Sequence, residues 1–96
     1  MTKTKTITLY HGTKAKNIKS IRKHGIKTGR DGEVDLVNMK RYAETYTDSG
    51  GYILKVVIPI SLVKLDYSMY EEDKLIFATS KKTIPKKYIK GLSKVK

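Results

Sequence analysis

The segment that organises this chain consists of YHGT at residues 10–13, NI at 17–18 and SIRKHGI at 20–26. Immediately before it, the β-branched and aromatic residues TITLY at 6–10 predict a strand. That strand ends at His11, a position from which a side chain can face a cleft. The pattern therefore predicts a strand, a tight turn and a short helix in direct succession.

The short helix is predicted from the residues that flank it. Gly12 allows a tight turn, or the close approach of a ligand to the backbone. Thr13 is the predicted N-cap of a helix over residues 14–23. Gly25 ends this helix, because glycine readily adopts the left-handed conformation of a helix C-terminus, and Ile26 supplies the hydrophobic contact of that cap.

The spacing of these motifs resembles the opening of the ADP-ribosyltransferase superfamily, in its poly(ADP-ribose)-polymerase-like and RNA 2′-phosphotransferase-like branches. That opening has an aromatic residue, His-Gly-Thr/Ser, a short helix with Asn-Ile, and a Gly-Ile/Leu end. Later parts of the chain also resemble the superfamily, namely the strand and helix at 32–46, the strand at 52–59 and TIPKKYI at 83–89. The resemblance implies a compact α+β fold with an ADP-ribosyltransferase-like split β-sheet and two short early helices.

Composition limits the class of protein. The 96 residues predict one domain over positions 1–96, and the 39% of hydrophobic residues are too many for a disordered chain. The sequence has no Cys, no apolar run as long as a membrane span, and no apolar signal-peptide core behind MTKTKT. We therefore expect a cytoplasmic protein without membrane association, disulfides or a thiolate metal site.

The charge of the chain is strongly positive. Its net charge is +12, from 21 Lys and Arg against nine acidic residues. Such a field concentrates polyanions near the surface, which favours nucleic acid as a partner. A solvated, lysine-rich surface is the alternative. The small size and the lysine content also fit a phage or mobile-element product that acts on a host protein in the host cytoplasm.

The rest of the chain predicts an α+β order of elements. A loop at 27–33 is expected at the rim of the cleft that holds His11. A short strand at 33–37 precedes an amphipathic helix at 39–47, with Asn38 as its N-cap. Further strands are predicted at 52–60, 62–66 and 75–79, with an acidic loop at 67–73.

The resemblance implies that the site binds NAD. His11 matches the first motif His, which hydrogen-bonds the ribose of NAD, and Gly12 matches the residue whose backbone pairs with the nicotinamide amide. Thr13 completes that motif, and Tyr46 falls where a Tyr stacks on the nicotinamide ring. Asp35 falls where one branch has a Tyr and the other a His, so the chain departs from both, and an Asp cannot stack on a ring.

The third motif residue is a Glu in many transferring members, and the resemblance puts it at the start of the strand at 75–79. Glu72 and Asp73 are the candidate catalytic residues, with the register left open. Cleavage of the bond between nicotinamide and ribose develops oxocarbenium character, which a nearby carboxylate stabilises. The alternative is that both acids are solvated counter-charges.

The resemblance implies an NAD-dependent ADP-ribosyltransferase that transfers ADP-ribose to a macromolecular acceptor, either a protein or a nucleic acid. Two other interpretations stay open, a non-catalytic module that binds nucleic acid or a partner protein through its basic surface, and an RNA 2′-phosphotransferase-like enzyme. Individual residues also have structural interpretations. His11 can be a strand-end residue bonded to a backbone carbonyl, Tyr46 can be a core residue, and His24 is expected to be structural at a helix C-terminus.

Overall fold

The computed structural model of the chain describes residues 5–29, 32–47, 50–67 and 76–95. These residues form a six-stranded antiparallel sheet in the order β4-β5-β2-β1-β3-β6, with two short α-helices. The predicted α+β class is confirmed. The strands are β1 (Thr6–Thr13), β2 (Val34–Val37), β3 (Tyr52–Pro59), β4 (Lys64–Tyr67), β5 (Ile76–Ser80) and β6 (Ile89–Lys94). The helices are α1 (Ile18–His24) and α2 (Lys40–Ala43), with 3-10 turns η1 (Ala15–Asn17), η2 (Glu44–Tyr46), η3 (Ile60–Leu62) and η5 (Lys86–Tyr88).

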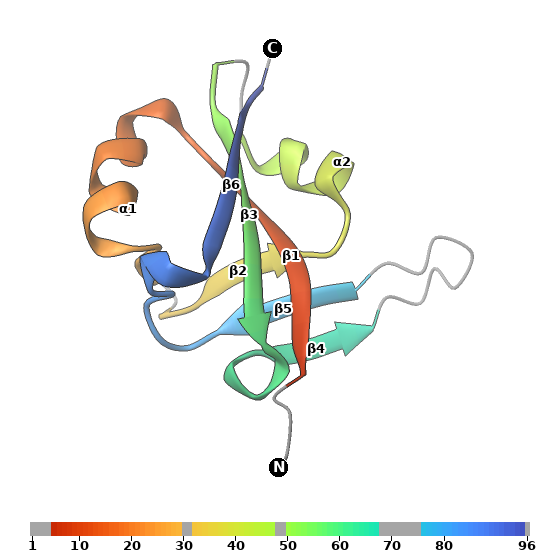
Figure 1. Cartoon of the computed structure of the whole chain (residues 1–96). Coiled ribbons are helices and arrows are strands. Elements are labelled where there is room, and N and C mark those ends of the chain that lie inside the picture. The colour runs from red at the N-terminus through yellow and green to blue at the C-terminus, as the bar shows by residue number, and fades with distance from the viewer. Residues whose placement is uncertain (1–4, 30–31, 48–49, 68–75, 96) are drawn as a thin grey trace.

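The sheet is divided between β1 and β2. β1 pairs with β3 along its whole length, whereas it pairs with β2 only at Tyr10 and Val37. The strands β4, β5 and β2 therefore form one group, and β1, β3 and β6 form another that runs across it (Figure 1). The end of β1 lies next to this division.

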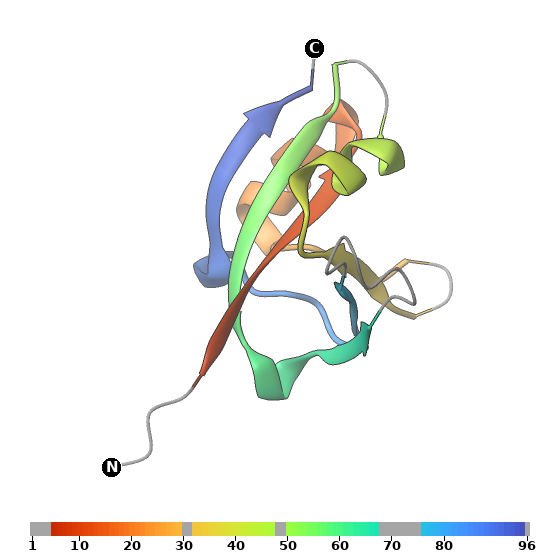
Figure 2. The same cartoon turned by 90° about the vertical axis from the view of Figure 1, so that its right-hand side faces the viewer.

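Side chains that alternate along the strands enter two separate cores. Leu54 of β3 packs in a cluster with Ile21 of α1, while its neighbour Ile53 packs in a second cluster with Ala43 of α2. The two helices therefore cover opposite faces of the group formed by β1, β3 and β6. In Figure 2, α2 lies in front of β3 and α1 lies behind it.

Both predicted N-caps are wrong. Thr13 is the last residue of β1, because β3 continues opposite it as far as Tyr52. Asn38 does not cap α2, whose N-cap is Met39. Its side-chain oxygen instead accepts a hydrogen bond of 2.8 Å from the N–H of Ile76, and its own N–H donates to the Ile76 carbonyl at 3.0 Å. Asn38 thereby fixes the start of β5 beside the end of β2.

The turn after α1 depends on a glycine. Gly25 has a positive φ of 83°, as predicted, but its ψ of −172° lies outside the left-handed helical region, so the predicted left-handed helix cap is wrong. A side chain at this position would collide with the backbone carbonyl of Ile84. The next residue, Ile26, exchanges two backbone hydrogen bonds of 2.9 Å with Ile84. The end of α1 is thus held against the segment that leads into η5.

β6 is an edge strand that the sequence pattern did not predict. It pairs antiparallel with β3 from Tyr52 to Val56, with an irregularity in register between Lys55 and Val56.

In the described part of the chain, no helix has the length and apolar content needed to cross a membrane.

Candidate functional site

A cavity of about 230 Å³ opens beside the end of β1. Its lining includes His11 and Thr13 from β1, Asn17 and Ser20 from the helical segment that follows, and residues 25–27. His11 and Thr13 lie two positions apart on one strand, so their side chains point to the same face, the one that α1 covers. The cavity is therefore formed where β1, α1 and the turn after α1 meet.

The imidazole of His11 crosses the division of the sheet. Its Nδ1 lies 2.8 Å from the backbone carbonyl oxygen of Asp35 in β2. A carbonyl oxygen only accepts hydrogen bonds, so Nδ1 carries the proton and Nε2 of the neutral ring is an acceptor. This bond agrees with the structural interpretation of His11. It also fixes the tautomer that the ring presents to the cavity.

The protonation of His11 follows from its half-buried position. Burial lowers the pKa of His11 below its ordinary value of 6.5, while the hydrogen bond to the Asp35 carbonyl and the negative charge of Asp35 oppose this shift. The ring is therefore neutral at pH 7. A neutral ring with its proton on Nδ1 can accept a hydrogen bond from a hydroxyl group through Nε2.

Hydrogen bonds in the cavity and next to it hold the end of β1. Asn17 Nδ2 donates to Thr13 Oγ1 at 3.2 Å, and Thr47 Oγ1 donates to the backbone carbonyl of Thr13 at 2.8 Å. The side-chain oxygen of Asn17 and the hydroxyl of Ser20 add further hydrogen-bonding groups, and Lys27 adds an exposed positive charge. This set can bind a ligand that has several hydroxyls and a phosphate.

The predicted site residues are only partly brought together. Gly12 is buried in β1 between His11 and Thr13. Asp35 lies in β2 opposite Thr79, and its side chain is exposed, so it contributes to the site through its carbonyl. The backbone of Tyr46 ends η2.

The other predicted site residues lie wholly or partly outside the described residues. The side chain of Tyr46, and the whole of Glu72 and Asp73, lie outside the part of the chain that the structure describes. Arg30, in the loop predicted at the rim of the cleft, also falls outside it.

The sequence pattern did not assign Asn17 and Ser20 to the cavity. Lys27 does line it, in agreement with the loop at 27–33 expected at the rim of the cleft. A local signal was present for Asn17 and Ser20, because their spacing of three residues places them on one side of the helical segment that follows β1.

Comparison with known proteins assigns no family or function to the cavity. No protein-family model matches the sequence, and no curated protein matches it. Within the described ranges, no group of three or more His, Asp or Glu residues is arranged to hold a metal ion.

Proposed function

We propose that this protein binds NAD in the cavity beside His11 and transfers its ADP-ribose to a macromolecular acceptor. The observation that carries the proposal is the state of His11, a neutral imidazole that donates through Nδ1 to the Asp35 carbonyl and offers Nε2 as an acceptor. The resemblance to ADP-ribosyltransferases assigns to this residue a hydrogen bond with the ribose of NAD, and a ribose hydroxyl is a donor that Nε2 can accept.

The surroundings of His11 support the same substrate. The cavity combines hydroxyl and amide groups from Thr13, Asn17 and Ser20 with the positive charge of Lys27, which suits a ribose joined to phosphate. The sheet is divided next to His11, and a split sheet is what the resemblance implies. The Gly12 backbone would face the nicotinamide amide.

The bond that breaks in this reaction joins the nicotinamide nitrogen to the ribose. The bonding electrons leave with nicotinamide, and an acceptor group on the second substrate forms the new bond to the ribose carbon. A carboxylate stabilises the positive charge that develops there, and Glu72 or Asp73 is assigned this role. Both precede β5, whose start is held beside β2 by the two hydrogen bonds between Ile76 and Asn38.

A non-catalytic module is the second candidate function. It is favoured by Asp35, which the resemblance aligns with an aromatic or His motif position and whose side chain is exposed on β2. Such a module would bind the nucleotide, or a nucleic acid or protein partner, without breaking the glycosidic bond.

Release of nicotinamide distinguishes the two functions. The purified protein is incubated with NAD, and free nicotinamide is measured by chromatography, with His11→Ala and His24→Ala in parallel. His24 is exposed on α1 and is not among the residues that line the cavity, so its variant is the matched control. The transferase proposal expects release by the parent and His24→Ala and at least tenfold less by His11→Ala. Binding of NAD without any release by the parent would favour the non-catalytic module.

A further inference from the structure

The charges of this chain are divided by segment. Residues 1–30 and 74–96 contain no acidic residue and hold seventeen of the 21 basic residues. All nine acidic residues lie in 31–73, together with the remaining four basic ones. The net charge of +12 is therefore the difference between two strongly basic ends and an acidic middle.

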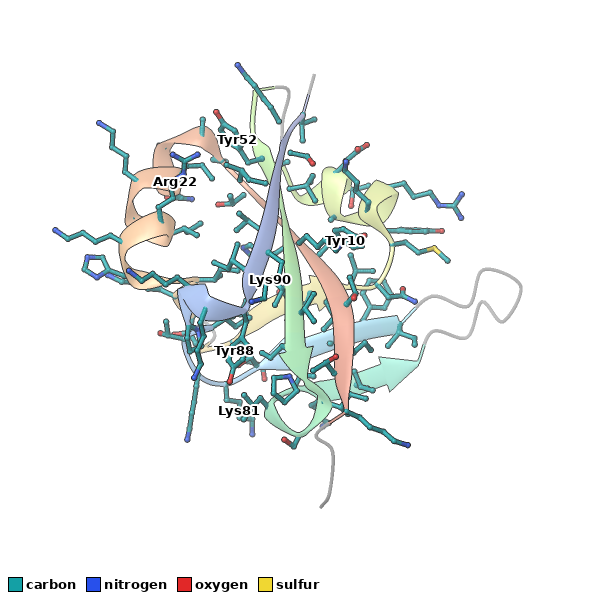
Figure 3. All side chains as sticks on the ribbon, in the orientation of Figure 1. Tyr10, Arg22, Tyr52, Lys81, Tyr88 and Lys90 are labelled. Carbon is teal, nitrogen blue, oxygen red and sulfur yellow. The ribbon has the colours of Figure 1, made fainter. Side chains whose placement is uncertain are left out.

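The fold brings the two basic ends together. A second cavity, of about 370 Å³, lies between α1 from the first basic segment and β6 from the last. We call it the α1–β6 groove. Arg22 of α1 and Lys86 of η5 both line it, and Lys90 is carried by the neighbouring β6 (Figure 3). Exposed lysines at 90 and 94 continue the positive charge along β6.

The floor of the groove is aliphatic. Apart from Gly91 and the two basic residues, its lining consists of Ile18, Ile21, Leu54, Ile89 and Leu92. Leu92 remains 37% exposed, which makes it one of the large hydrophobic side chains that the described part of the protein leaves in contact with solvent. An aliphatic floor between basic walls fits a partner that is apolar on one side and acidic at its borders.

The backbone beside the groove is also available for pairing. Among the described strands, β6 is the last in the sheet order and pairs with β3 on one side only. An extended peptide can add to such an edge by main-chain hydrogen bonds, while its alternate side chains enter an adjacent pocket. Lysines on an edge strand disfavour pairing with a second copy of the same strand, because the like charges repel, and favour pairing with an acidic strand.

We propose that the α1–β6 groove docks an extended acidic peptide segment of a partner protein, with its aliphatic side chains on the groove floor. The proposal does not depend on the function assigned to the cavity beside His11. Nucleic acid fits the same charge less well, because unpaired bases bind by stacking on rings and none of the described residues that line the groove is aromatic.

The first test uses a peptide whose two faces match the groove. The hexapeptide Glu-Leu-Glu-Leu-Glu-Leu has the length of β6, six residues, and places every Leu on one side of an extended chain. Its fluorescein-labelled form is titrated with the full-length protein and followed by fluorescence anisotropy. We expect saturable binding of this peptide by the parent. Leu92→Ser in the protein should weaken binding about tenfold or more, and so should a control peptide in which all three Leu are replaced by Ser. Equal affinity for the two peptides would overturn the proposal.

Charge variants separate docking in the groove from general attraction. Arg22→Glu and Lys86→Glu change charges at the groove, whereas Lys64→Glu makes the same change of net charge in β4, at the opposite edge of the sheet. We expect the first two to weaken peptide binding several-fold more than the third. An equal loss in all three variants would contradict docking at this site.

Measurements on the same proteins would show whether the groove binds nucleic acid or a second copy of the protein instead. A single-stranded RNA oligonucleotide that displaces the peptide from the parent, and binds Leu92→Ser as tightly as the parent, would assign the surface to nucleic acid. A parent protein that sediments as a dimer, with Leu92→Ser monomeric, would assign the groove to a second copy. Either result would overturn the proposal of an acidic peptide.

Discussion

His11 Nδ1 donates a hydrogen bond of 2.8 Å to the backbone carbonyl of Asp35, and this bond joins β1 to β2 where their ladder of backbone bonds ends. The same contact therefore has two consequences. It satisfies a carbonyl at the division of the sheet, and it fixes the tautomer of a ring that lines the cavity. Substitutions of His11 should separate the structural consequence from the chemical one.

The structural consequence predicts different stabilities for two variants. The side-chain amide of Asn reaches about as far as Nδ1 of His, so His11→Asn should keep the bond to the Asp35 carbonyl. His11→Ala removes the donor and should lower the free energy of unfolding by about 1 kcal/mol. Urea denaturation followed by circular dichroism measures both, with the exposed His24→Ala as control. Equal losses in the Asn and Ala variants would show that the bond to Asp35 does not stabilise the fold.

The lowered pKa of His11 predicts a dependence of stability on pH. The unfolded chain binds a proton at about pH 6.5, whereas the folded protein binds it only at lower pH, because burial disfavours the charged ring. The contribution of His11 to stability is thus fully present above pH 6.5 and is lost as the pH falls through the lowered pKa. His11→Asn has no imidazole to titrate, so the parent should become less stable than His11→Asn as the pH falls below 7. A difference in unfolding free energy that stays constant with pH would contradict this assignment.

Gly25 provides a prediction about the turn that closes the cavity. Gly25→Ala places a Cβ against the carbonyl of Ile84 at a positive φ, so it should cost about 2 kcal/mol or more. Gly32→Ala is a matched control, since Gly32 also has a positive φ, of 77°, but a Cβ there meets nothing within 4 Å. It should cost about 1 kcal/mol. Thermal unfolding of both variants measures the difference, and similar losses would argue against the close contact with Ile84.

Asn38 links the ends of β2 and β5, and its substitution tests that link. Asn38→Ala removes the acceptor for the Ile76 N–H and should destabilise the protein by about 1 kcal/mol, while Asn38→Asp keeps an acceptor and should cost less. If Asn38 were the N-cap of α2, Asp would cap the helix as well as Asn does, so Asn38→Asp would leave the stability unchanged. Amide hydrogen exchange at Ile76 distinguishes the cases, because faster exchange is expected in the Ala variant only when Asn38 holds this amide.

The sequence predicts the strands whose own residues favour them. Five of the eight residues at 52–59 are Ile, Leu or Val, and β3 occurs where the strand at 52–60 was predicted. β6 was missed, because IKGLSK contains Gly and Lys and becomes a strand through its pairing with β3. Thr13 was assigned to a helix cap for a similar reason, since only the length of the partner strand extends β1 that far.

The cavity could be predicted only in part. The cleft beside His11 was expected from the local motif, and the half-buried imidazole does line a cavity. Its bond to Asp35 joins residues 24 positions apart in the chain, and its closure depends on the pairing of Ile26 with Ile84. Neither contact has a local sequence signal, because both arise from the way distant segments of the chain meet.

The central claim is that His11 binds NAD through Nε2, and a calorimetric titration of the parent and His11→Asn with NAD tests it most directly. The Asn variant should keep the bond to Asp35 and the stability of the parent, but it lacks a group at the position of Nε2. We predict saturable binding by the parent and at least tenfold weaker binding by His11→Asn at equal stability. NAD binding of equal affinity in the two proteins, or no binding by the parent, would contradict the account.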